Sequence, residues 1–413
     1  MLYNFPQDIT LEEVRFAITR ANARLEVNTF IEADRGDYVI FNYVISFPEV
    51  FPIPITGDAE LDREYAILRE CRGLTFYKDG RIAARKFHKF FNVGERPETL
   101  PGEIDWTASH SLFLKEDGSM ITPFWNGDEL QWHTKMGDTD VAKLVWPVLD
   151  RWIKTGNPAD YIGFAQYCRI QGLTPMFEFC SRSQRIVVDH PVDRMPLLAV
   201  RNNQTGEYLP YANLLAYGHT FNLEVVGQHS SANVGDIEYF LSQTAGEVGI
   251  EGYIIAFEDG HRLKVKTDEY RTIHRVVSDL ASEKSVVRLI VEDKLDDAMP
   301  MLAEEDRAMV LDFARRFNEG IASSATAVDE YARIGKEASD DQRGFALFVT
   351  THVPERLRPL VFRAGAGSDV QEATRALIAK HLGSGPRLET VRDLWGGHRW
   401  EWGNQMGQRV ADE

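Results

Sequence analysis

The spacing of apolar and polar residues changes character near residue 280. Before that point, short runs of strand composition, such as residues 37–47 (DYVIFNYVISF), alternate with turn dipeptides. Four of these dipeptides are typical of β-hairpins: Asp79-Gly80, Asp117-Gly118, Asn126-Gly127 and Asp259-Gly260. Apolar residues recur at helical spacing in residues 11–25, 146–156 and 159–172. The pattern therefore predicts strands interrupted by a few helices.

After about residue 280 the strand-like runs fade and helical periodicity takes over. One helical face is formed by Val310, Phe313, Ala314, Phe317 and Ile321, and a later one by Ala373, Ala376, Leu377 and Lys380. A chain of 413 residues is too long for one ordinary core. We therefore predict an α+β protein with a mostly antiparallel β domain over residues 1–280, which includes a small mixed lobe over residues 1–60. An all-α carboxy-terminal domain is expected over residues 281–413.

The composition is that of an ordinary soluble globular protein, with 44% hydrophobic and 26% charged residues. No apolar run is long enough to span a bilayer, and the start MLYNFPQDIT lacks the pattern of a secretory signal. The three cysteines are odd in number and form no CxxC pair, which favours reduced thiols. We expect a cytoplasmic protein without a membrane partner. The sequence does not indicate an oligomeric state.

The net charge of −17 argues against nucleic-acid binding unless positive charge is concentrated locally. Residues 81–96 (RIAARKFHKFFNVGER) offer such a concentration, because five basic residues and three phenylalanines accompany the single acid Glu95. Basic groups beside aromatic rings suit a nucleotide or a single strand. The same stretch also fits a strand whose phenylalanines are core and whose charges are solvated.

Four short strings carry candidate chemistry. Lys115 precedes the Asp117-Gly118 turn, where its ammonium group could enter a cleft or simply be exposed. Strand alternation places Glu178 on the face opposite Phe177 and Phe179, on a cleft wall or on the surface. Glu251 and Gly252 open an apolar strand.

The fourth string contains Lys264 and Lys266, which alternation places on one strand face about 7 Å apart. Two ammonium groups on one face repel each other. Such a face is either fully solvated or meets an anion such as a polyphosphate.

In this order, the strings KEDG, FEF, EGY and KVK resemble the motif series of covalent nucleotidyltransferases, which include DNA ligases, RNA ligases and mRNA-capping enzymes. Further strings resemble the RNA ligase 1 family of T-even phages: ECRG at 70–73, KFFN at 89–92, RIV at 185–187, TGEY at 205–208 and KVKTDEY at 264–270. The resemblance spans roughly residues 38 to 300.

This resemblance implies an ATP-grasp-like ligase domain that joins an RNA 5′-phosphate to a 3′-hydroxyl in RNA or tRNA repair. ATP and Mg²⁺, or Mn²⁺, are the implied cofactors, and single-stranded RNA or tRNA ends the implied partners. By position, Lys115 would be the nucleophile that takes AMP, Tyr270 an essential tyrosine and Asp296 a metal ligand. The implied ATP-site residues are Tyr43, Arg72, Lys89, Glu178, Glu251, Lys264 and Lys266. Glu269 replaces a tryptophan of the family, so no role is transferred to it.

The implied chemistry needs a neutral lysine. An ordinary lysine has a pKa near 10.4, so only about one in a thousand is uncharged at neutral pH. Cations such as Lys264 and Lys266 would favour the neutral amine of Lys115 and stabilise the phosphoryl oxygens.

Three alternatives remain: a DNA ligase, a capping guanylyltransferase and an RNA-end-binding protein without catalysis. The ECRG and KFFN strings, and the absence of an OB-like β-rich tail, argue against the first two. The intact lysines Lys115, Lys264 and Lys266 argue against the third.

Overall fold

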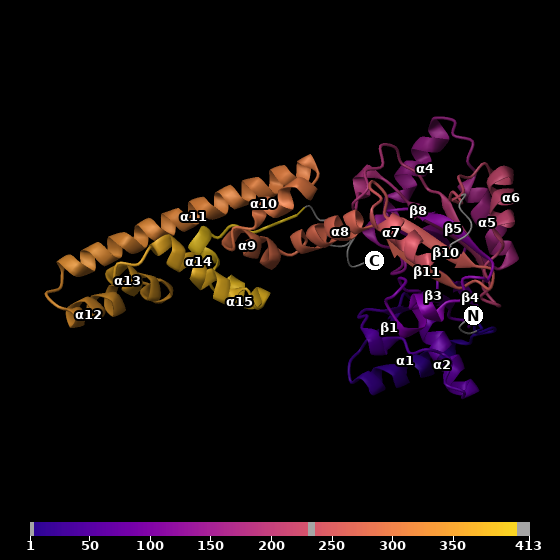
Figure 1. Cartoon of the computed structure of the whole chain (residues 1–413), viewed down its shortest axis with the longest axis horizontal. Coiled ribbons are helices and arrows are strands. Elements are labelled where there is room, and N and C mark those ends of the chain that lie inside the picture. The colour runs from indigo at the N-terminus through magenta and orange to yellow at the C-terminus, as the bar shows by residue number, and fades with distance from the viewer. Residues whose placement is uncertain (1–3, 230–235, 403–413) are drawn as a thin grey trace. The chain divides into compact units, whose positions relative to one another are not determined.

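The computed structural model describes residues 4–229 and 236–402. These residues form two compact units, 4–272 and 273–402, which divide within helix α8 (Asp268–Leu280). The first unit contains antiparallel sheets covered by helices, and the regular elements described in the second unit are helices (Figure 1). The predicted α+β class, with a helical region after the sheets, is confirmed.

The amino-terminal lobe is one antiparallel sheet covered by two helices. Its strands are β1 (Phe30–Asp34), β2 (Tyr38–Tyr43), β3 (Arg72–Tyr77) and β4 (Ile82–Ala84), hydrogen-bonded in that order. Helices α1 (Leu11–Leu25) and α2 (Ala59–Glu70) pack against each other, and α1 begins with a capping box between Thr10 and Glu13. The lobe therefore extends beyond the expected boundary at residue 60, because β3 and β4 complete its sheet.

Two further sheets follow in the first unit. One contains β5 (His110–Lys115), β10 (Gly252–Phe257) and β11 (Arg262–Lys266) in the order β11-β10-β5. The other contains β6 (Ser119–Asn126), β7 (Glu129–His133), β8 (Leu173–Phe179) and β9 (Leu197–Asn202) in the order β7-β6-β8-β9. Helices α3 (Asp140–Lys143), α4 (Val145–Lys154), α5 (Tyr161–Gln171) and α6 (Tyr211–Phe221) share a core with the second of these sheets, and α7 (Ile237–Ala245) packs on the first.

Three of the four predicted hairpin turns connect paired strands, but the turn at Asp117-Gly118 does not. β5 pairs with β10, whereas β6 pairs with β7 and β8, so the chain passes here from one sheet to the other. A Cβ atom at Gly118 would lie 2.5 Å from the carbonyl oxygen of Phe179. The glycine is therefore required by the close approach of this connection to β8 and not by a hairpin, and Lys115 and Ser119 lie on different sheets.

The basic stretch 81–96 forms neither an exposed patch nor a strand with solvated charges. β4 ends at Ala84, and the guanidinium group of Arg85 is fully buried against Glu70. The ammonium group of Lys86 donates to the carbonyl of Gly73 at 2.8 Å, and burial lowers the pKa of Lys86 to about 7. The expectation of a strand with solvated charges is therefore wrong, because these charges have internal partners. The basic groups beside aromatic rings do border cavities, at Phe87 and Phe90 in one and at Lys89 in another.

The second unit is helical throughout its described residues. It contains α9 (Glu283–Val291), α10 (Leu295–Ala298), α11 (Glu304–Glu337), α12 (Gln342–His352), α13 (Arg358–Gly365), α14 (Val370–His381) and α15 (Gly385–Glu389) around one core. The predicted face of α11 is buried as expected. In α14 the expected face is wrong at Ala376 and Lys380, which are exposed. The buried face instead contains Thr374 and the large side chain of Ile378.

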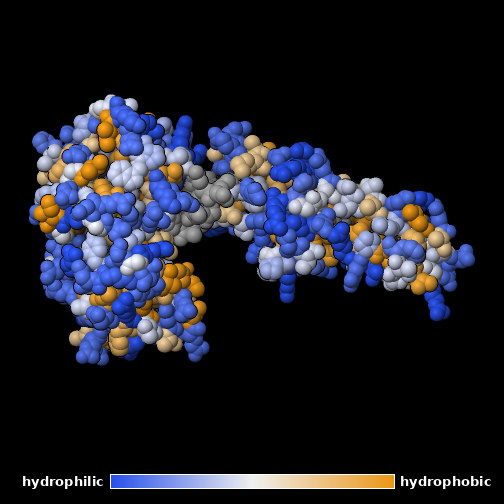
Figure 2. Space-filling model, turned by 180° about the vertical axis from the view of Figure 1, so that it is seen from behind, coloured by the Kyte–Doolittle hydropathy of each residue, from blue (hydrophilic) through white to orange (hydrophobic). Residues whose placement is uncertain are grey.

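Cys71, Cys168 and Cys180 are free thiols, and all three are buried in the first unit. Burial raises the pKa of each thiol. Among the described residues, no helix has the length and apolarity to cross a membrane. Hydrophilic residues cover most of the face shown in Figure 2, and the apolar ones occur in small groups.

Candidate active site

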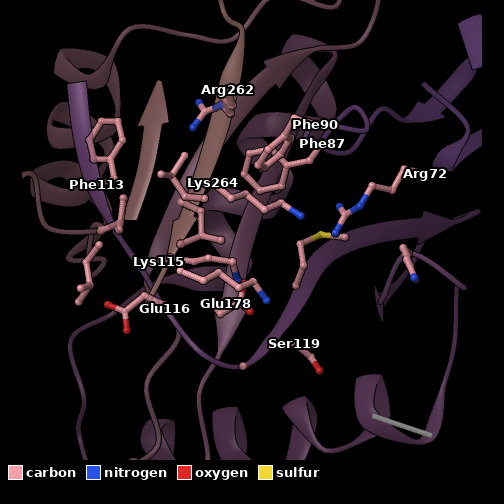
Figure 3. A pocket seen from close by; sticks show the side chains of 18 of the residues that line it. Arg72, Phe87, Phe90, Phe113, Lys115, Glu116, Ser119, Glu178, Arg262 and Lys264 are labelled. Atoms are coloured by element: carbon pink, nitrogen blue, oxygen red, sulfur yellow. The ribbon is translucent and has the colours of Figure 1, made fainter. Parts of the chain in front are cut away.

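Strands of all three sheets border one cavity of ≈ 170 Å³ in the first unit, called the lysine cavity below (Figure 3). Its lining contains six basic residues and two acidic ones: Arg72, Lys115, Lys135, Arg262, Lys264, Lys266, Glu116 and Glu178. Glu116 is itself held by Arg194 at 3.0 Å. The excess of cations suits a polyanionic ligand, while Phe113, Leu198, Val226 and Ile254 provide apolar walls for a ring system.

Lys115 is the last residue of β5, and its ammonium group lies 2.6 Å from a carboxylate oxygen of Glu251. The ammonium group of Lys266 lies 3.0 Å from the same oxygen. Glu251 is buried and immediately precedes Gly252, which pairs with both Lys115 and Lys266 across the sheet. Gly252 has φ +143°, and a Cβ atom there would lie 2.0 Å from the carbonyl of Val265. Only glycine permits this approach, which brings the two lysines to one carboxylate.

Lys264 and Lys266 lie on the cavity face of β11, as alternation predicts, and Leu263 and Val265 are buried behind them. The ammonium group of Lys264 lies 5.0 Å from the centre of the Phe90 ring. Burial, followed by the charges of Lys115, Arg72, Lys89 and Lys266, holds the pKa of Lys264 well below its ordinary value. These cations repel one another, and a bound anion would remove that repulsion.

Glu178 also faces the lysine cavity, while Phe177 and Phe179 are fully buried on the other face of β8. This arrangement agrees with the alternation predicted for the Phe-Glu-Phe string. Alternation alone left open whether Glu178 lies on a cleft wall or on the surface. The structure places its carboxyl group on the cavity wall.

Tyr270 does not line the lysine cavity but contacts Asp117, in the turn that follows Lys115. Its buried hydroxyl donates to one oxygen of Asp117 at 2.8 Å. The other Asp117 oxygen accepts the backbone N–H groups of Val187 and Val188 at 2.8 and 2.6 Å. Burial, and then the charge of Glu251, raise the pKa of Asp117 to about 6. Asp117 thus ties the turn after Lys115 to two distant segments.

Among the predicted residues of the amino-terminal lobe, Arg72 lines the lysine cavity, whereas Tyr43 and Lys89 lie beside it. The ammonium groups of Lys89 and Lys135 lie 4.9 and 5.3 Å from the centre of the Tyr43 ring. Burial favours the neutral phenol, yet the charges of Arg72, Lys89 and Lys135 lower the pKa of Tyr43 to about 8. Tyr43 and Lys89 therefore belong to the same electrostatic cluster.

Lys135 lines the cavity but carries no signal that the sequence analysis recognised. It follows β7 in a turn, and its backbone carbonyl accepts a hydrogen bond from the Asn42 amide at 2.8 Å. A Cβ atom at Gly73, where φ is +85°, would lie 2.7 Å from that carbonyl. Gly73 therefore allows the backbone of Lys135 to lie close to β3. A contact between residues so far apart in the sequence produces no local sequence pattern.

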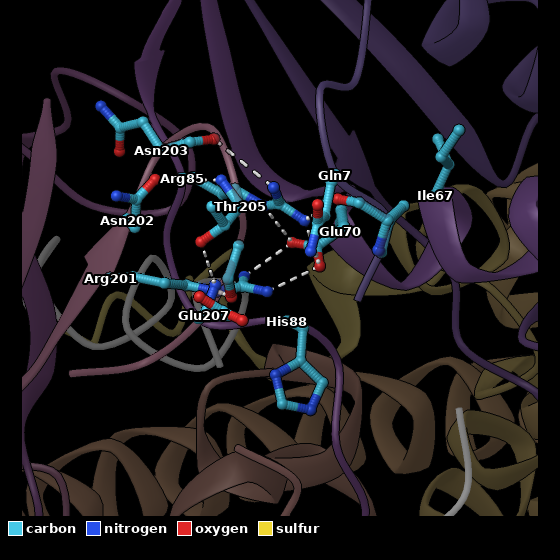
Figure 4. Close-up of polar contacts among 12 residues, drawn as sticks. Gln7, Ile67, Glu70, Arg85, His88, Arg201, Asn202, Asn203, Thr205 and Glu207 are labelled. Carbon is cyan, nitrogen blue, oxygen red and sulfur yellow. Dashed lines mark hydrogen bonds and ion pairs between the residues drawn. The ribbon is translucent and has the colours of Figure 1, made fainter. Parts of the chain in front are cut away.

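A buried cluster of one acid and two arginines lies close to Arg72 in the sequence (Figure 4). Glu70, at the end of α2, accepts hydrogen bonds from Arg85 at 3.0 Å and from Arg201 of β9 at 2.6 Å. All three side chains are at most 1% exposed. Burial alone would raise the pKa of Glu70, but Arg201 and Arg85 hold it below its ordinary value. The cluster joins the amino-terminal lobe to β9 two residues before Arg72.

Asp296 is not part of the lysine cavity. It lies on α10 in the second unit, where its side chain is exposed. Within the described residues, no group of three or more histidine, cysteine, aspartate or glutamate side chains is arranged to hold a metal ion. Magnesium commonly uses only one or two carboxylates together with substrate phosphates. Glu178 on the cavity wall provides one carboxylate for such a site.

A family model described as RNA ligase matches residues 70–270, which include all the cavity strings from Arg72 to Tyr270. A Thermovibrio ammonificans protein, provisionally named an RNA ligase, is 25% identical over 347 residues, 80% of this chain and 83% of its own. RNA ligase 1 of bacteriophage TS2126 is 24% identical over 322 residues, 74% of each chain. The predicted family is confirmed for the matched region.

Two further proteins resemble shorter parts of the chain. A protein of Autographa californica nuclear polyhedrosis virus, provisionally named a bifunctional polynucleotide kinase/RNA ligase, is 26% identical over 278 residues, 59% of this chain and 36% of its own. A Naegleria gruberi RNA ligase solved with ATP and manganese is 16% identical, with a TM-score of 0.33, over 41% of this chain and 52% of that one.

Proposed function

We propose, from the premise that residues 70–270 belong to the RNA ligase family, that the protein is an ATP-dependent RNA ligase. It joins an RNA 5′-phosphate to a 3′-hydroxyl through lysyl-AMP and RNA-adenylate intermediates. The observation that carries this proposal is the position of Lys115, 2.6 Å from buried Glu251 in a cavity lined by five further basic residues.

In the first step the Lys115 amine attacks the α-phosphorus of ATP, an N–P bond forms, and the bond to pyrophosphate breaks. Glu251 is placed to accept the proton that the ammonium group must lose. Arg72, Lys264 and Lys266 face the transferring group and the leaving pyrophosphate, where fixed positive charge is most effective. Lys89, Lys135 and Tyr43 extend this cluster toward the terminal phosphates.

In the second step an oxygen of the RNA 5′-phosphate attacks the same phosphorus, the N–P bond breaks, and Lys115 regains its proton. In the third step the 3′-hydroxyl attacks the activated 5′-phosphate and loses its proton to water. A phosphodiester bond forms, the phosphoanhydride bond breaks, and AMP leaves. The lysine is a nucleophile only in the first step. The later steps need the cations of the cavity, because negative charge still accumulates on phosphoryl oxygens.

Magnesium, or manganese, would be held by Glu178 of the cavity wall together with phosphate oxygens and waters. Glu251 is a second candidate ligand from the resemblance, although its carboxylate here pairs with Lys115 and Lys266. When bound, the ion neutralises charge on the phosphates. Asp296 stays a proposal from the resemblance alone, because it lies in the second unit.

The test is incubation of the full chain with radiolabelled ATP or GTP, followed by a denaturing gel. A labelled band with ATP that disappears in Lys115→Arg supports the proposal, because arginine stays protonated and cannot attack. A band with GTP would indicate a capping enzyme, and no band with either would leave an RNA-end-binding protein. Sealing of matched RNA and DNA nicks and ends then separates an RNA ligase from a DNA ligase.

We further propose that the substrates are single-stranded RNA or tRNA ends, that the role is RNA repair, and that the enzyme works in the cytoplasm. The helical second unit is proposed to select the RNA. The RNA ligase family model over residues 70–270 and the phage relative, an RNA ligase 1, support RNA ends as the substrate.

A further inference from the structure

A second cavity of ≈ 350 Å³ adjoins the lysine cavity within the first unit. The two share Phe90 and Arg262 in their linings, so these side chains stand between them. The rest of the second lining contains Phe91, Phe257, His88, Lys89 and the acidic turn Glu258-Asp259. The adenylylation chemistry proposed above uses no residue of this cavity's own lining except Lys89.

Arg262 is the third basic residue on the cavity face of β11, two positions before Lys264 and four before Lys266 (Figure 3). Its guanidinium carbon lies 4.4 Å from the centre of the Tyr208 ring and 5.3 Å from that of Phe87. These two rings fix its position. Its Nε atom is buried and has no hydrogen-bond partner in the part of the chain that the structure describes.

Arg262 shares with Lys89 the lack of a carboxylate partner among the described residues, whereas several other polar groups of the second cavity are paired. Arg69 is paired with Glu98 at 2.7 Å, His261 with Asp259 at 3.2 Å, and Glu258 accepts the Ser109 hydroxyl at 2.7 Å. Among the described residues, no carboxylate lies within ion-pair distance of Arg262. A partly buried cation without a counter-ion is costly, and an anionic ligand removes that cost.

The rest of the second cavity suits a nucleobase. Phe90, Phe91 and Phe257 present aromatic rings, and bases stack on such rings without regard to sequence. Arg262 lies at the boundary with the lysine cavity, whereas Glu103, Asp105 and Glu258 lie among the remaining lining residues. Carboxylates accept hydrogen bonds from base amino groups but repel phosphates, so the phosphate of a bound nucleotide would lie at Arg262.

We propose that this second cavity is a subsite for one nucleotide of the RNA substrate, with its phosphate against Arg262 and its base against the phenylalanine rings. The proposal rests on the proposed function, because it assumes that RNA is the substrate. A free nucleotide has the same chemistry, and the experiment below separates the two sources.

The experiment measures binding of a fluorescent 5′-phosphorylated oligoribonucleotide to the full chain without ATP, over a range of salt concentrations. Arg262→Met is expected to weaken binding about tenfold and to reduce the slope of log affinity against log salt by about 0.7, the contribution of one phosphate contact in a single strand. Arg262→Lys should restore the slope, because it restores the charge. Phe257→Leu should weaken binding about tenfold at unchanged slope, because it removes a stacking surface and no charge.

Arg81→Met and Phe16→Leu are the matched controls, since both side chains are exposed and outside the two cavities. Unchanged RNA affinity and salt slope in Arg262→Met would overturn the proposal. So would a loss of ATP affinity at unchanged RNA affinity, because it would assign Arg262 to the free nucleotide. The labelled-ATP gel is independent of this measurement. If it shows no adduct while RNA binding changes as expected, the ligase proposal fails and the subsite stands.

Discussion

The Tyr270 hydroxyl reaches Asp117 at 2.8 Å and holds the turn that follows Lys115. We predict that Tyr270→Phe slows lysyl-AMP formation about tenfold, because Asp117 loses one of three donors. The loss of one hydrogen bond to a buried carboxylate should also lower the free energy of unfolding by about 2 kcal/mol. Single-turnover labelling with ATP measures the first effect and urea denaturation the second.

Tyr253→Phe is the matched control, since it removes a 2.7 Å hydrogen bond from a phenol to Glu247 in the same unit. It should cost stability without slowing the charging of Lys115 to the same degree. Equal slowing in both variants would show that Tyr270 has no special role in positioning.

Lys86 makes stability depend on pH. Its folded pKa of about 7 lies below the unfolded value near 10.5. Between these values the unfolded chain binds more protons, so the free energy of unfolding rises as pH rises. We predict an increase of about 2 kcal/mol between pH 7 and pH 9 that is absent in Lys86→Met. Urea denaturation at both pH values measures the free energy of unfolding. The same change in this free energy between pH 7 and pH 9 in both proteins would contradict the prediction.

Residues could be predicted where a distinctive group sits in a distinctive local pattern. Lys115 before its turn, Glu178 between two phenylalanines and the alternating Lys264 and Lys266 are such cases, and all four line the lysine cavity. Arg262 lines it too, and the alternation that places Lys264 and Lys266 on one face also includes Arg262, so this residue was predictable but was not singled out. Lys135 lines the cavity through the close approach of its carbonyl to Gly73, a contact made across the fold. Local spacing contains no trace of such contacts.

The end of α2 and the end of β9 are joined through Glu70, which pairs with both Arg85 and Arg201. Glu70→Gln should lower the free energy of unfolding by about 3 kcal/mol, because two buried guanidinium groups lose their counter-charge. It should also raise the KM for ATP, since Arg72 follows two residues later. Glu32→Gln, which breaks an exposed pair with Arg15, is the control and should cost at most about 1 kcal/mol. Similar costs for both variants would contradict the prediction.

Whole elements were easier to predict than their connections. Helices α1, α4, α5 and α11 agree with their apolar spacing, because a buried face repeats with the helical period. The connection at Asp117-Gly118 was predicted wrongly, because the same dipeptide serves a hairpin and a passage between two sheets. Which strand pairs with β5 depends on β10, more than a hundred residues later in the chain.

The chain divides into two compact units, so the proposed role of the second unit in substrate choice can be tested by removing it. A chain ending at Thr272 keeps every residue that lines the lysine cavity, together with Tyr270. We predict that it still forms lysyl-AMP and joins simple single strands, but loses any preference for a tRNA loop over a linear RNA. Auto-adenylylation and sealing of the two substrates, compared with the full chain, provide the measurement.

A longer truncated chain that ends near residue 300 would keep Asp296 but is less suitable. Val286, Val287 and Ile290 of α9 belong to the core of the second unit and would be exposed in it. An unchanged substrate ratio in the shorter chain would contradict a selecting role for the helices. If the chain ending at Thr272 still forms lysyl-AMP, Asp296 is not needed for the transfer of AMP to Lys115.

All three cysteines of the chain lie in the first unit, and their side chains are buried in its cores. Thiol reagents therefore have no target on the native surface, and alkylation can proceed only through opening of that unit. Labelling at increasing urea concentration should accordingly follow the unfolding of the catalytic unit alone, while circular dichroism also follows the helices of the second. Two separated transitions would give each unit its own stability without dividing the chain. Rapid modification of a thiol in the native protein would contradict this prediction.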